Sequence, residues 1–223
     1  MELWFDDYHQ EDVKLGINVQ KVVHTEQTEY QHVAVLDSRE YGRILTLDGE
    51  LITTEKDEYF YSEMMAHVPL SANPNIKNVL VIGGCDGGVL CELEKYQSIE
   101  NIDVVELDQR LVEICQEHLP ETRPCFDDPR VSLYIQDALK FVRHCENTYD
   151  LIIALSKGIN NELLVGDFYQ HSVSAVNNSG KPFKKGKNEI TYQEFIALLK
   201  KERCKIDDKQ LLKSRRCSSY ICD

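Results

Sequence analysis

The sequence lacks a long uninterrupted hydrophobic run. No stretch of its 223 residues approaches the ~20 apolar residues that a membrane-spanning helix needs, so we expect no membrane partner. The first residues, Met1 to Tyr8, include acidic side chains and no apolar run, which is not typical of a secretory leader. Both absences lead us to expect a cytoplasmic protein.

Basic residues are scarce relative to acidic ones. The 25 Lys and Arg residues are outnumbered by 38 Asp and Glu residues, which gives a formal net charge of -13. Proteins that bind nucleic acids need a basic face, so this balance argues against DNA or RNA as a partner. An acidic protein attracts cationic ligands, although solubility alone explains the same balance at least as well.

The eight cysteines lack the paired spacing of a metal site. No C-x-x-C pair occurs among them. Because we expect no secretory leader, we predict free thiols rather than disulfides. We also predict no metal site.

The first third has the pattern of antiparallel β structure. Apolar and β-branched residues alternate or cluster in residues 13–23, 30–38 and 42–54. The pair Asp48-Gly49 interrupts the last run, and an Asp-Gly pair between apolar runs is typical of a tight hairpin. We therefore predict a small N-terminal antiparallel β domain in residues 1–56.

A helix is predicted next, followed by a repeating pattern of strand and helix. Residues 57–70 suit a helix that ends near Pro69, with an apolar face that includes the core pair Met64 and Met65 together with Tyr59 and Val68. From residue 78 on, four apolar strands alternate with helical segments, the last of them at residues 166–176. This order predicts an α/β fold with a doubly wound parallel sheet in residues 57–223, truncated or divergent after about residue 177.

A glycine-rich turn joins the first of these strands to its helix. It reads Gly83-Gly84-Cys85-Asp86-Gly87-Gly88, and glycine lets the backbone approach a ligand closely. Glu106 ends the second strand about 20 residues further on, where an acid typically binds ribose hydroxyls, and Asp137 ends the third. The ordered set predicts an adenosine site. Asp86 argues against a dinucleotide, because its carboxylate would face a pyrophosphate.

At this point the sequence resembles a known family. Residues 28–31 (TEYQ), 42–70, 79–93 (VLVIGGCDGGVLCEL) and 104–108 (VVELD) are similar to the spermidine synthases, which are polyamine aminopropyltransferases. The resemblance runs from about Leu3 to Asp150 and weakens through Ala175. It implies a methyltransferase-like Rossmann domain, decarboxylated S-adenosylmethionine as the donor and a putrescine-like amine as the acceptor. Spermidine and methylthioadenosine would be the products, and the chain would form a homodimer or a larger homo-oligomer.

The resemblance also implies roles for individual residues. Asp86 would hold the charged end of the aminopropyl group or of the amine, Tyr61 would line the amine channel, and Ser62 stands where bacterial enzymes often have His or Gln. The residues implied on the nucleotide side are Gln31, Gly83, Gly84, Asp86, Glu106, Asp137 and Ala138. Gln31 would contact the donor or its product, Glu106 the ribose, and Asp137 with Ala138 the adenine.

The catalytic residue itself is unknown, because the family pattern breaks where it is expected. After the fourth strand the family has an acidic segment, yet here Leu155 replaces the expected Asp, Gly158 replaces the second acid, and Lys157 adds a positive charge. Four alternatives stay open. They are an active enzyme with a base relocated to Glu162 or Asp167, a catalytically dead nucleotide-binding paralogue, a damaged product whose last third is not family sequence, and an S-adenosylmethionine-dependent methyltransferase.

Overall fold

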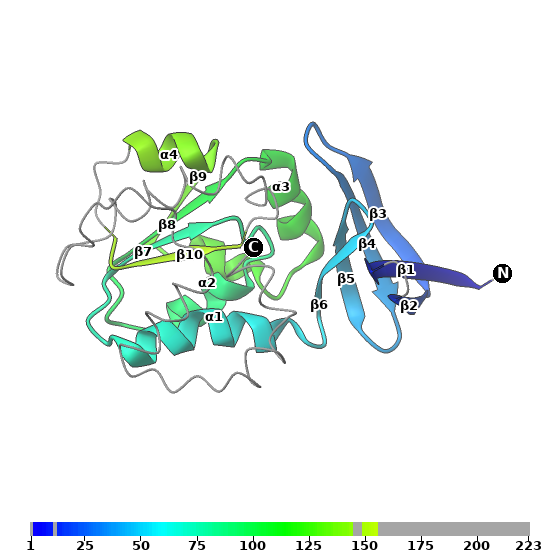
Figure 1. Ribbon diagram of the computed structural model, residues 1–223, viewed down its shortest axis with the longest axis horizontal. Helices are drawn as coiled ribbons and strands as arrows, with labels where there is room; N and C mark the ends of the chain where they lie inside the picture. Colours follow the sequence, from blue (N-terminus) through cyan, green and yellow to red (C-terminus); the bar gives the residue numbers. More distant parts are fainter. Residues whose placement is uncertain (1, 11–12, 145–148, 156–223) are drawn as a thin grey trace.

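The computed structural model describes residues 2–10, 13–144 and 149–155, and Figure 1 shows how they are arranged. Two β units at the N-terminal end lie beside an α/β unit that holds a parallel sheet. The helix predicted at residues 166–176 and the polar tail after residue 177 lie outside the described residues. In the part of the chain that the structure describes, no helix is long and apolar enough to cross a membrane.

The N-terminal part is antiparallel, as predicted. Strands β1 (Leu3–Gln10) and β2 (Val13–Val19) form a two-stranded ribbon. The second sheet has the order β3-β4-β5-β6, with β3 at Lys21–Gln27, β4 at His32–Ser38, β5 at Gly42–Leu47 and β6 at Glu50–Thr54. The apolar run at 13–23 is therefore divided between two strands, and β1 is a strand that the sequence pattern did not reveal.

The hairpin at Asp48-Gly49 is confirmed. Leu47 pairs with Glu50, so two residues make the whole turn between β5 and β6. Asp48 and Gly49 have φ values of 52° and 81°, the left-handed conformation that Asp tolerates and Gly adopts freely. The Asp48 side chain also accepts a hydrogen bond of 2.8 Å from the backbone N–H of His32, which ties the turn to β4.

Helix α1 (Glu58–Ala72) exists, but its predicted apolar face was wrong. The buried residues are Ser62, Ala66 and Leu70, spaced four apart along one face. Met64 and Val68 are more than half exposed, and Met65 packs only partly against the core. Small side chains at 62 and 66 let α1 pack closely on the rest of the α/β unit, so the larger residues face outward. Pro69 lies inside the helix rather than after it.

The parallel sheet has the order β10-β7-β8-β9. Its strands are β7 (Asn78–Ile82), β8 (Asn101–Glu106), β9 (Val131–Ile135) and β10 (Leu151–Ala154). Successive strands β7, β8 and β9 extend the sheet in one direction, whereas β10 pairs on the other side of β7. The strand order thus reverses at β7, and ligands of doubly wound sheets bind beyond the carboxyl ends of the strands at such a point.

Helices cover both faces of this sheet. Helix α2 (Gly88–Glu94) and α1 pack on the face that carries Val79 and Val81, whereas α4 (Ala138–His144) packs on the face that carries Leu80 and Ile82. Coverage of both faces explains why β7 is apolar and buried from Val79 to Ile82. Helix α3 (Gln109–His118) lies between the parallel sheet and the β3–β6 sheet (Figure 1), and its apolar side shares one core with β4 and β5.

One cysteine pair corrects the prediction of free thiols. Cys91 on α2 and Cys125 on the short 3-10 helix η1 (Arg123–Asp127) form a disulfide, with 5.2 Å between their Cα atoms. The two residues are 34 positions apart, so nothing local in the sequence marks them as partners. They meet because η1 packs against α2. Cys85 and Cys115 are free thiols, as predicted.

Candidate active site

The glycine-rich turn between β7 and α2 is built on left-handed glycines. Gly83, Gly84 and Gly87 have φ values of 78°, 78° and 79°, which side chains strongly disfavour. The Gly83 N–H donates to the Val105 carbonyl at 2.9 Å, which anchors the turn to β8. Cys85 fits within the turn because its φ is not positive and its side chain is buried beside α3. Contact with the Cys115 thiol, together with burial, raises the pKa of the Cys85 thiol.

Asp86 occupies the middle of this turn. Its carboxylate accepts hydrogen bonds from the backbone N–H groups of Asp86 itself, Gly87 and Gly88, which lower the pKa of Asp86. Burial and, second, repulsion by the Glu58 carboxylate outweigh them and raise the pKa of Asp86 to about 6. An acid held in this way is stabilised by a bound cation and is repelled by a phosphate.

Glu106 ends β8 at the same edge of the sheet. Its Oε1 atom accepts hydrogen bonds from the backbone N–H groups of Leu107 at 2.8 Å and Asp108 at 3.3 Å. Burial raises the pKa of Glu106, and the charges of Asp108 and Asp86 raise it further. The backbone thus holds the acid in a fixed orientation beside the glycine-rich turn, where the sequence predicts a ribose contact.

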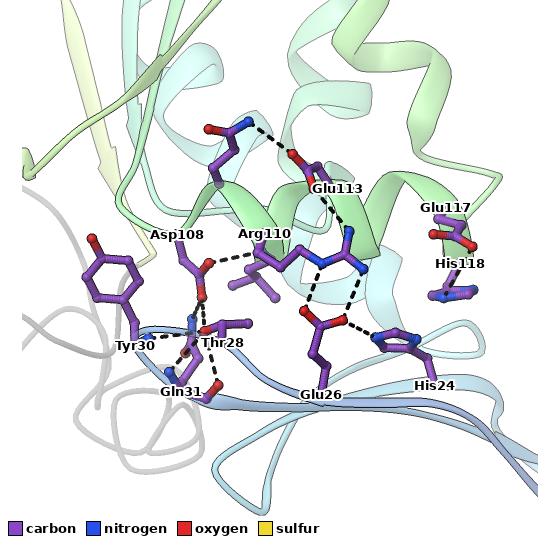
Figure 2. A network of polar contacts seen from close by, with 12 residues as sticks. His24, Glu26, Thr28, Tyr30, Gln31, Asp108, Arg110, Glu113, Glu117 and His118 are labelled. Atoms are coloured by element: carbon purple, nitrogen blue, oxygen red, sulfur yellow. Dashed lines mark hydrogen bonds and ion pairs between the residues drawn. The ribbon is translucent and has the colours of Figure 1, made fainter.

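Asp108 is a buried residue of this region to which the sequence analysis gave no role. Its side chain caps α3 by accepting from the Leu111 N–H at 3.1 Å. Its Oδ2 atom accepts from the Thr28 hydroxyl at 2.6 Å and from the Gln31 amide at 3.2 Å, and Figure 2 shows these contacts reaching the turn between β3 and β4. Asp108 therefore positions Gln31. Its place just before a helical segment is an N-cap signal that could have revealed it.

A second set of polar contacts joins β3 to α3 in Figure 2. The Arg110 guanidinium donates to both carboxylate oxygens of Glu26, at 2.8 and 3.0 Å, and to Glu113 at 3.0 Å. Hydrogen bonds from Arg110 lower the pKa of Glu26, and a hydrogen bond of 3.1 Å with His24 lowers it further. These contacts hold the β3–β6 sheet against the helix that carries Asp108.

Asp137 and Ala138 follow β9 at the same edge. Asp137 accepts a hydrogen bond of 2.8 Å from the Lys140 N–H through its side chain, and its carbonyl accepts from Phe141 at 2.9 Å. Both contacts hold the first turn of α4, which begins at Ala138. The structure thus has both residues just beyond a strand of the parallel sheet, as the sequence predicts. Their contact with adenine stays a prediction.

Helix α1 brings Ser62 close to the end of the turn at Gly88. Ser62 is buried, and its hydroxyl donates to the Glu58 Oε1 atom at 2.6 Å. A Cβ atom placed on Gly88 would lie 2.0 Å from that Glu58 oxygen and 2.5 Å from the Ser62 hydroxyl, so this close approach requires glycine. Tyr61 is half-buried on the same helix. Glu58, which the sequence analysis missed, thus reaches the helix that follows the turn.

Leu155 lies where the sequence analysis expected an acid. Its N–H donates to the Ile82 carbonyl at 2.7 Å, which continues the pairing of β10 with β7. The side chain lies against the glycine-rich turn, because a Cβ atom on Gly84 would be 2.8 Å from the Leu155 Cδ1 atom. The structure therefore places an apolar side chain beside the turn, and the catalytic role that the resemblance implies for this position stays a prediction. Lys157, Gly158, Glu162 and Asp167 lie outside the described residues.

One cluster elsewhere has ligand atoms of the kind that metals use. Glu63 and His67 on α1 lie within 4.8 Å of Glu92 on α2. The Glu92 carboxylate is already paired with His67 at 3.0 Å and with Lys95 at 2.5 Å, and His67 contacts the Tyr96 hydroxyl at 2.7 Å. These partners account for the arrangement without an ion, and the absence of a metal stays a prediction.

Comparison with known proteins identifies the same family that the sequence resembles. Residues 58–209 match the family model described as the spermine/spermidine synthase domain, and residues 3–55 match the spermidine synthase tetramerisation domain. A polyamine aminopropyltransferase of Clostridium beijerinckii is 48% identical over 183 residues, which are 81% of this chain and 64% of the relative. This chain therefore spans less than two thirds of that relative's length.

Two solved structures are similar. The spermidine synthase of Thermotoga maritima superimposes with a TM-score of 0.72 at 35% identity, covering 79% of this chain and 60% of that one. A spermidine synthase in complex with the transition-state analogue AdoDATO gives a TM-score of 0.75 at 35% identity, covering 79% and 62%. These likenesses confirm the predicted α/β fold with an N-terminal β unit.

Proposed function

The chain belongs to the spermidine synthase family, and from this premise we propose that it transfers the aminopropyl group of decarboxylated S-adenosylmethionine to a putrescine-like amine. The observation that carries the proposal is Asp86, a half-buried carboxylate in the middle of the glycine-rich turn. An acid at this place suits a donor that carries a sulfonium and an ammonium, and it disfavours phosphate-bearing nucleotides.

The reaction requires a neutral amine. The acceptor arrives as an ammonium and must first lose one proton, because an ammonium nitrogen has no electron pair for attack. The nitrogen then attacks the methylene carbon bonded to the sulfonium. A C–N bond forms, the C–S bond breaks, and its electron pair stays on sulfur, which leaves neutral methylthioadenosine. The product is a spermidine-like polyamine whose newly bonded nitrogen carries the positive charge.

Residues at the carboxyl edge of β7, β8 and β9 would hold the nucleotide. Gly83 and Gly84 let the donor approach the backbone, and the Glu106 carboxylate is placed to accept hydrogen bonds from the ribose hydroxyls. Asp137 with Ala138 would contact the adenine. Gln31, which Asp108 positions at 3.2 Å, would reach the donor from the β3–β4 turn.

The structure of the amine side supports a lowered rate. A positioned general base typically contributes ~10²–10⁴ to the rate, and Leu155 cannot accept a proton. We therefore propose slow turnover that rests on orientation and on the fraction of amine that is neutral in solution. Nucleotide binding does not depend on Leu155 and should have ordinary strength.

We further propose that the chain forms a homo-oligomer through its N-terminal part, which matches the tetramerisation domain. Leu3, Trp4, Tyr8 and Val13 are exposed apolar residues on the β1–β2 ribbon, 48%, 53%, 68% and 53% accessible, as is typical of a surface that another chain covers. Size-exclusion chromatography coupled to light scattering would test this proposal. The Trp4→Ala variant should form smaller oligomers than the wild type.

The test of the activity is methylthioadenosine release from decarboxylated S-adenosylmethionine and putrescine, with Asp86→Ala as the control. Release above the control would support the proposal. If the protein releases none but still binds methylthioadenosine, the chain is a nucleotide-binding protein without transferase activity. If it neither releases nor binds methylthioadenosine, the proposed function is wrong.

A further inference from the structure

Two carboxylates, from Asp86 within the glycine-rich turn and from Glu58 on α1, lie close to Gly88. Asp86 accepts the Gly88 N–H, whereas the Glu58 Oε1 atom lies 2.0 Å from the position that a Cβ atom on Gly88 would take. Glu58 is close enough for its charge to repel that of Asp86. The two acids come from different elements, one from the first turn of α1 and the other from the turn after β7.

This pair of acids has no cationic partner in the described part of the chain. None of the ion pairs among the described residues includes Asp86 or Glu58. Like charges at short range, partly removed from water, are unfavourable until a positive charge lies between them. The arrangement therefore favours a bound cation more strongly than a single acid would.

Glu58 is also held in place. The buried Ser62 hydroxyl donates to its Oε1 atom at 2.6 Å, one helical turn further along α1. A carboxylate has acceptor sites for several hydrogen bonds, so this contact with Ser62 fixes the side chain without using up its capacity to accept. A fixed side chain loses little conformational freedom when a ligand binds, which is the advantage of a preorganised site.

From this geometry we propose that Glu58 is a second carboxylate of the amine subsite and that it holds, with Asp86, an ammonium group of the amine substrate. The inference rests on the proposed function and extends it to a residue to which the resemblance gives no role. Glu58 thereby supplies a negative charge near Gly88, whereas the apolar Leu155 lies against Gly84. The chemical class of the ligand is a primary alkylammonium, for which putrescine is the probe.

The test compares three proteins by calorimetry: the wild type, Glu58→Gln and the matched control Glu63→Gln, an exposed residue of the same helix. Each is titrated with methylthioadenosine, and then with putrescine in the presence of methylthioadenosine. Loss of one charged hydrogen-bond partner should weaken putrescine binding by about 10- to 100-fold in Glu58→Gln. Methylthioadenosine binding should stay within about twofold, and Glu63→Gln should behave as the wild type.

A second variant tests whether the position of Glu58 matters as well as its charge. Ser62→Ala removes the hydroxyl that holds Glu58 but keeps its charge, so putrescine binding should weaken by less, about two- to tenfold. Equal putrescine affinity in wild type and Glu58→Gln would overturn the inference, and so would a wild type that binds methylthioadenosine but no amine. A wild type that binds neither ligand would refute the proposed function itself, and with it the inference.

Discussion

The two halves of the proposed site differ in how they are held. On the proposed nucleotide side, the carboxylates of Glu106, Asp108 and Asp137 each accept a hydrogen bond from a backbone N–H group and so stabilise a turn or the start of a helix. On the proposed amine side, Leu155 stands after β10 where the family has an acid, while its backbone keeps the regular pairing to Ile82. Residues that stabilise local structure are costly to replace, whereas a side chain that acts only on substrate can change while the fold persists.

Replacing Leu155 with Asp should have the largest effect, because it restores an acid on the proposed amine side. The carboxylate would lie beside the glycine-rich turn and accept the proton of the amine, so methylthioadenosine release should rise by ~10²-fold or more. Methylthioadenosine affinity should not change. The measurement is steady-state release with saturating donor and putrescine.

Leu155→Asn is the matched control for this variant, because it has nearly the same shape and polarity but cannot accept a proton to the same extent. If Leu155→Asn accelerates release as much as Leu155→Asp, the gain comes from polarity rather than from a base. If neither variant differs from wild type, the missing acid at 155 does not limit the rate.

Asp108→Ala tests the opposite claim, that the nucleotide side is tied to the fold. The variant loses a helix cap and two further hydrogen bonds to a charged acceptor, one of them buried and one partly buried. The free energy of unfolding should therefore fall by about 2–4 kcal/mol. Because Gln31 loses its partner, methylthioadenosine binding should weaken as well. Urea unfolding and calorimetry measure the two effects.

Asp108→Asn provides the comparison for Asp108→Ala, since its amide oxygen still caps α3. It should recover more than half of the lost stability. Unchanged stability in Asp108→Ala would show that the nucleotide side is as replaceable as the amine side.

Asp86→Asn should raise the stability of the protein at neutral pH and weaken its binding of putrescine. The pKa of Asp86 is raised from 3.8 to about 6 in the folded chain, so the folded state keeps a proton that the unfolded state loses as the pH rises from about 4 to 6. Wild-type stability therefore falls across that window and stays lower above it. Asp86→Asn does not titrate, so at pH 7.5 it should be more stable than wild type by about 1–3 kcal/mol.

The same variant should bind putrescine poorly, because a neutral amide replaces the carboxylate. Thermal melts at pH 4 and pH 7.5 test the stability claim, and the difference between variant and wild type should nearly disappear at pH 4. If the stability difference between variant and wild type is the same at pH 4 and at pH 7.5, burial and Glu58 do not destabilise the charged form of Asp86.

The sequence predicted most of what the backbone determines. The Asp48-Gly49 hairpin, the alternation of strand and helix, and the turn from Gly83 to Gly88 all depend on local signals that glycine, Asp-Gly pairs and apolar periodicity carry. The same signals placed Glu106 and Asp137 at strand ends. Family resemblance then identified Leu155 as the position where an acid is missing.

What the sequence did not reveal depends on contacts between distant elements. Ser62 is polar, yet it is buried because α1 packs its small residues inward, which reversed the predicted face of that helix. The Cys91–Cys125 disulfide depends on the packing of η1 on α2. Glu58 gained its place beside Asp86 through the same packing of α1, and no spacing in the sequence connects the two.

Glu26→Gln should have the smallest effect, and it tests whether the nucleotide side depends on the whole contact between β3 and α3. Arg110 donates to both Glu26 oxygens, but the Glu26 side chain is 32% accessible and the Arg110 side chain 41%, so water and salt screen the pair. Methylthioadenosine affinity should change by no more than about twofold in low salt and should match wild type in 0.5 M NaCl, since exposed ion pairs contribute little. Calorimetry at the two salt concentrations measures this. A large, salt-independent loss would mean that Glu26 and Arg110 set the position of Asp108 and Gln31, and that the nucleotide side is held by both sets of contacts rather than by Asp108 alone.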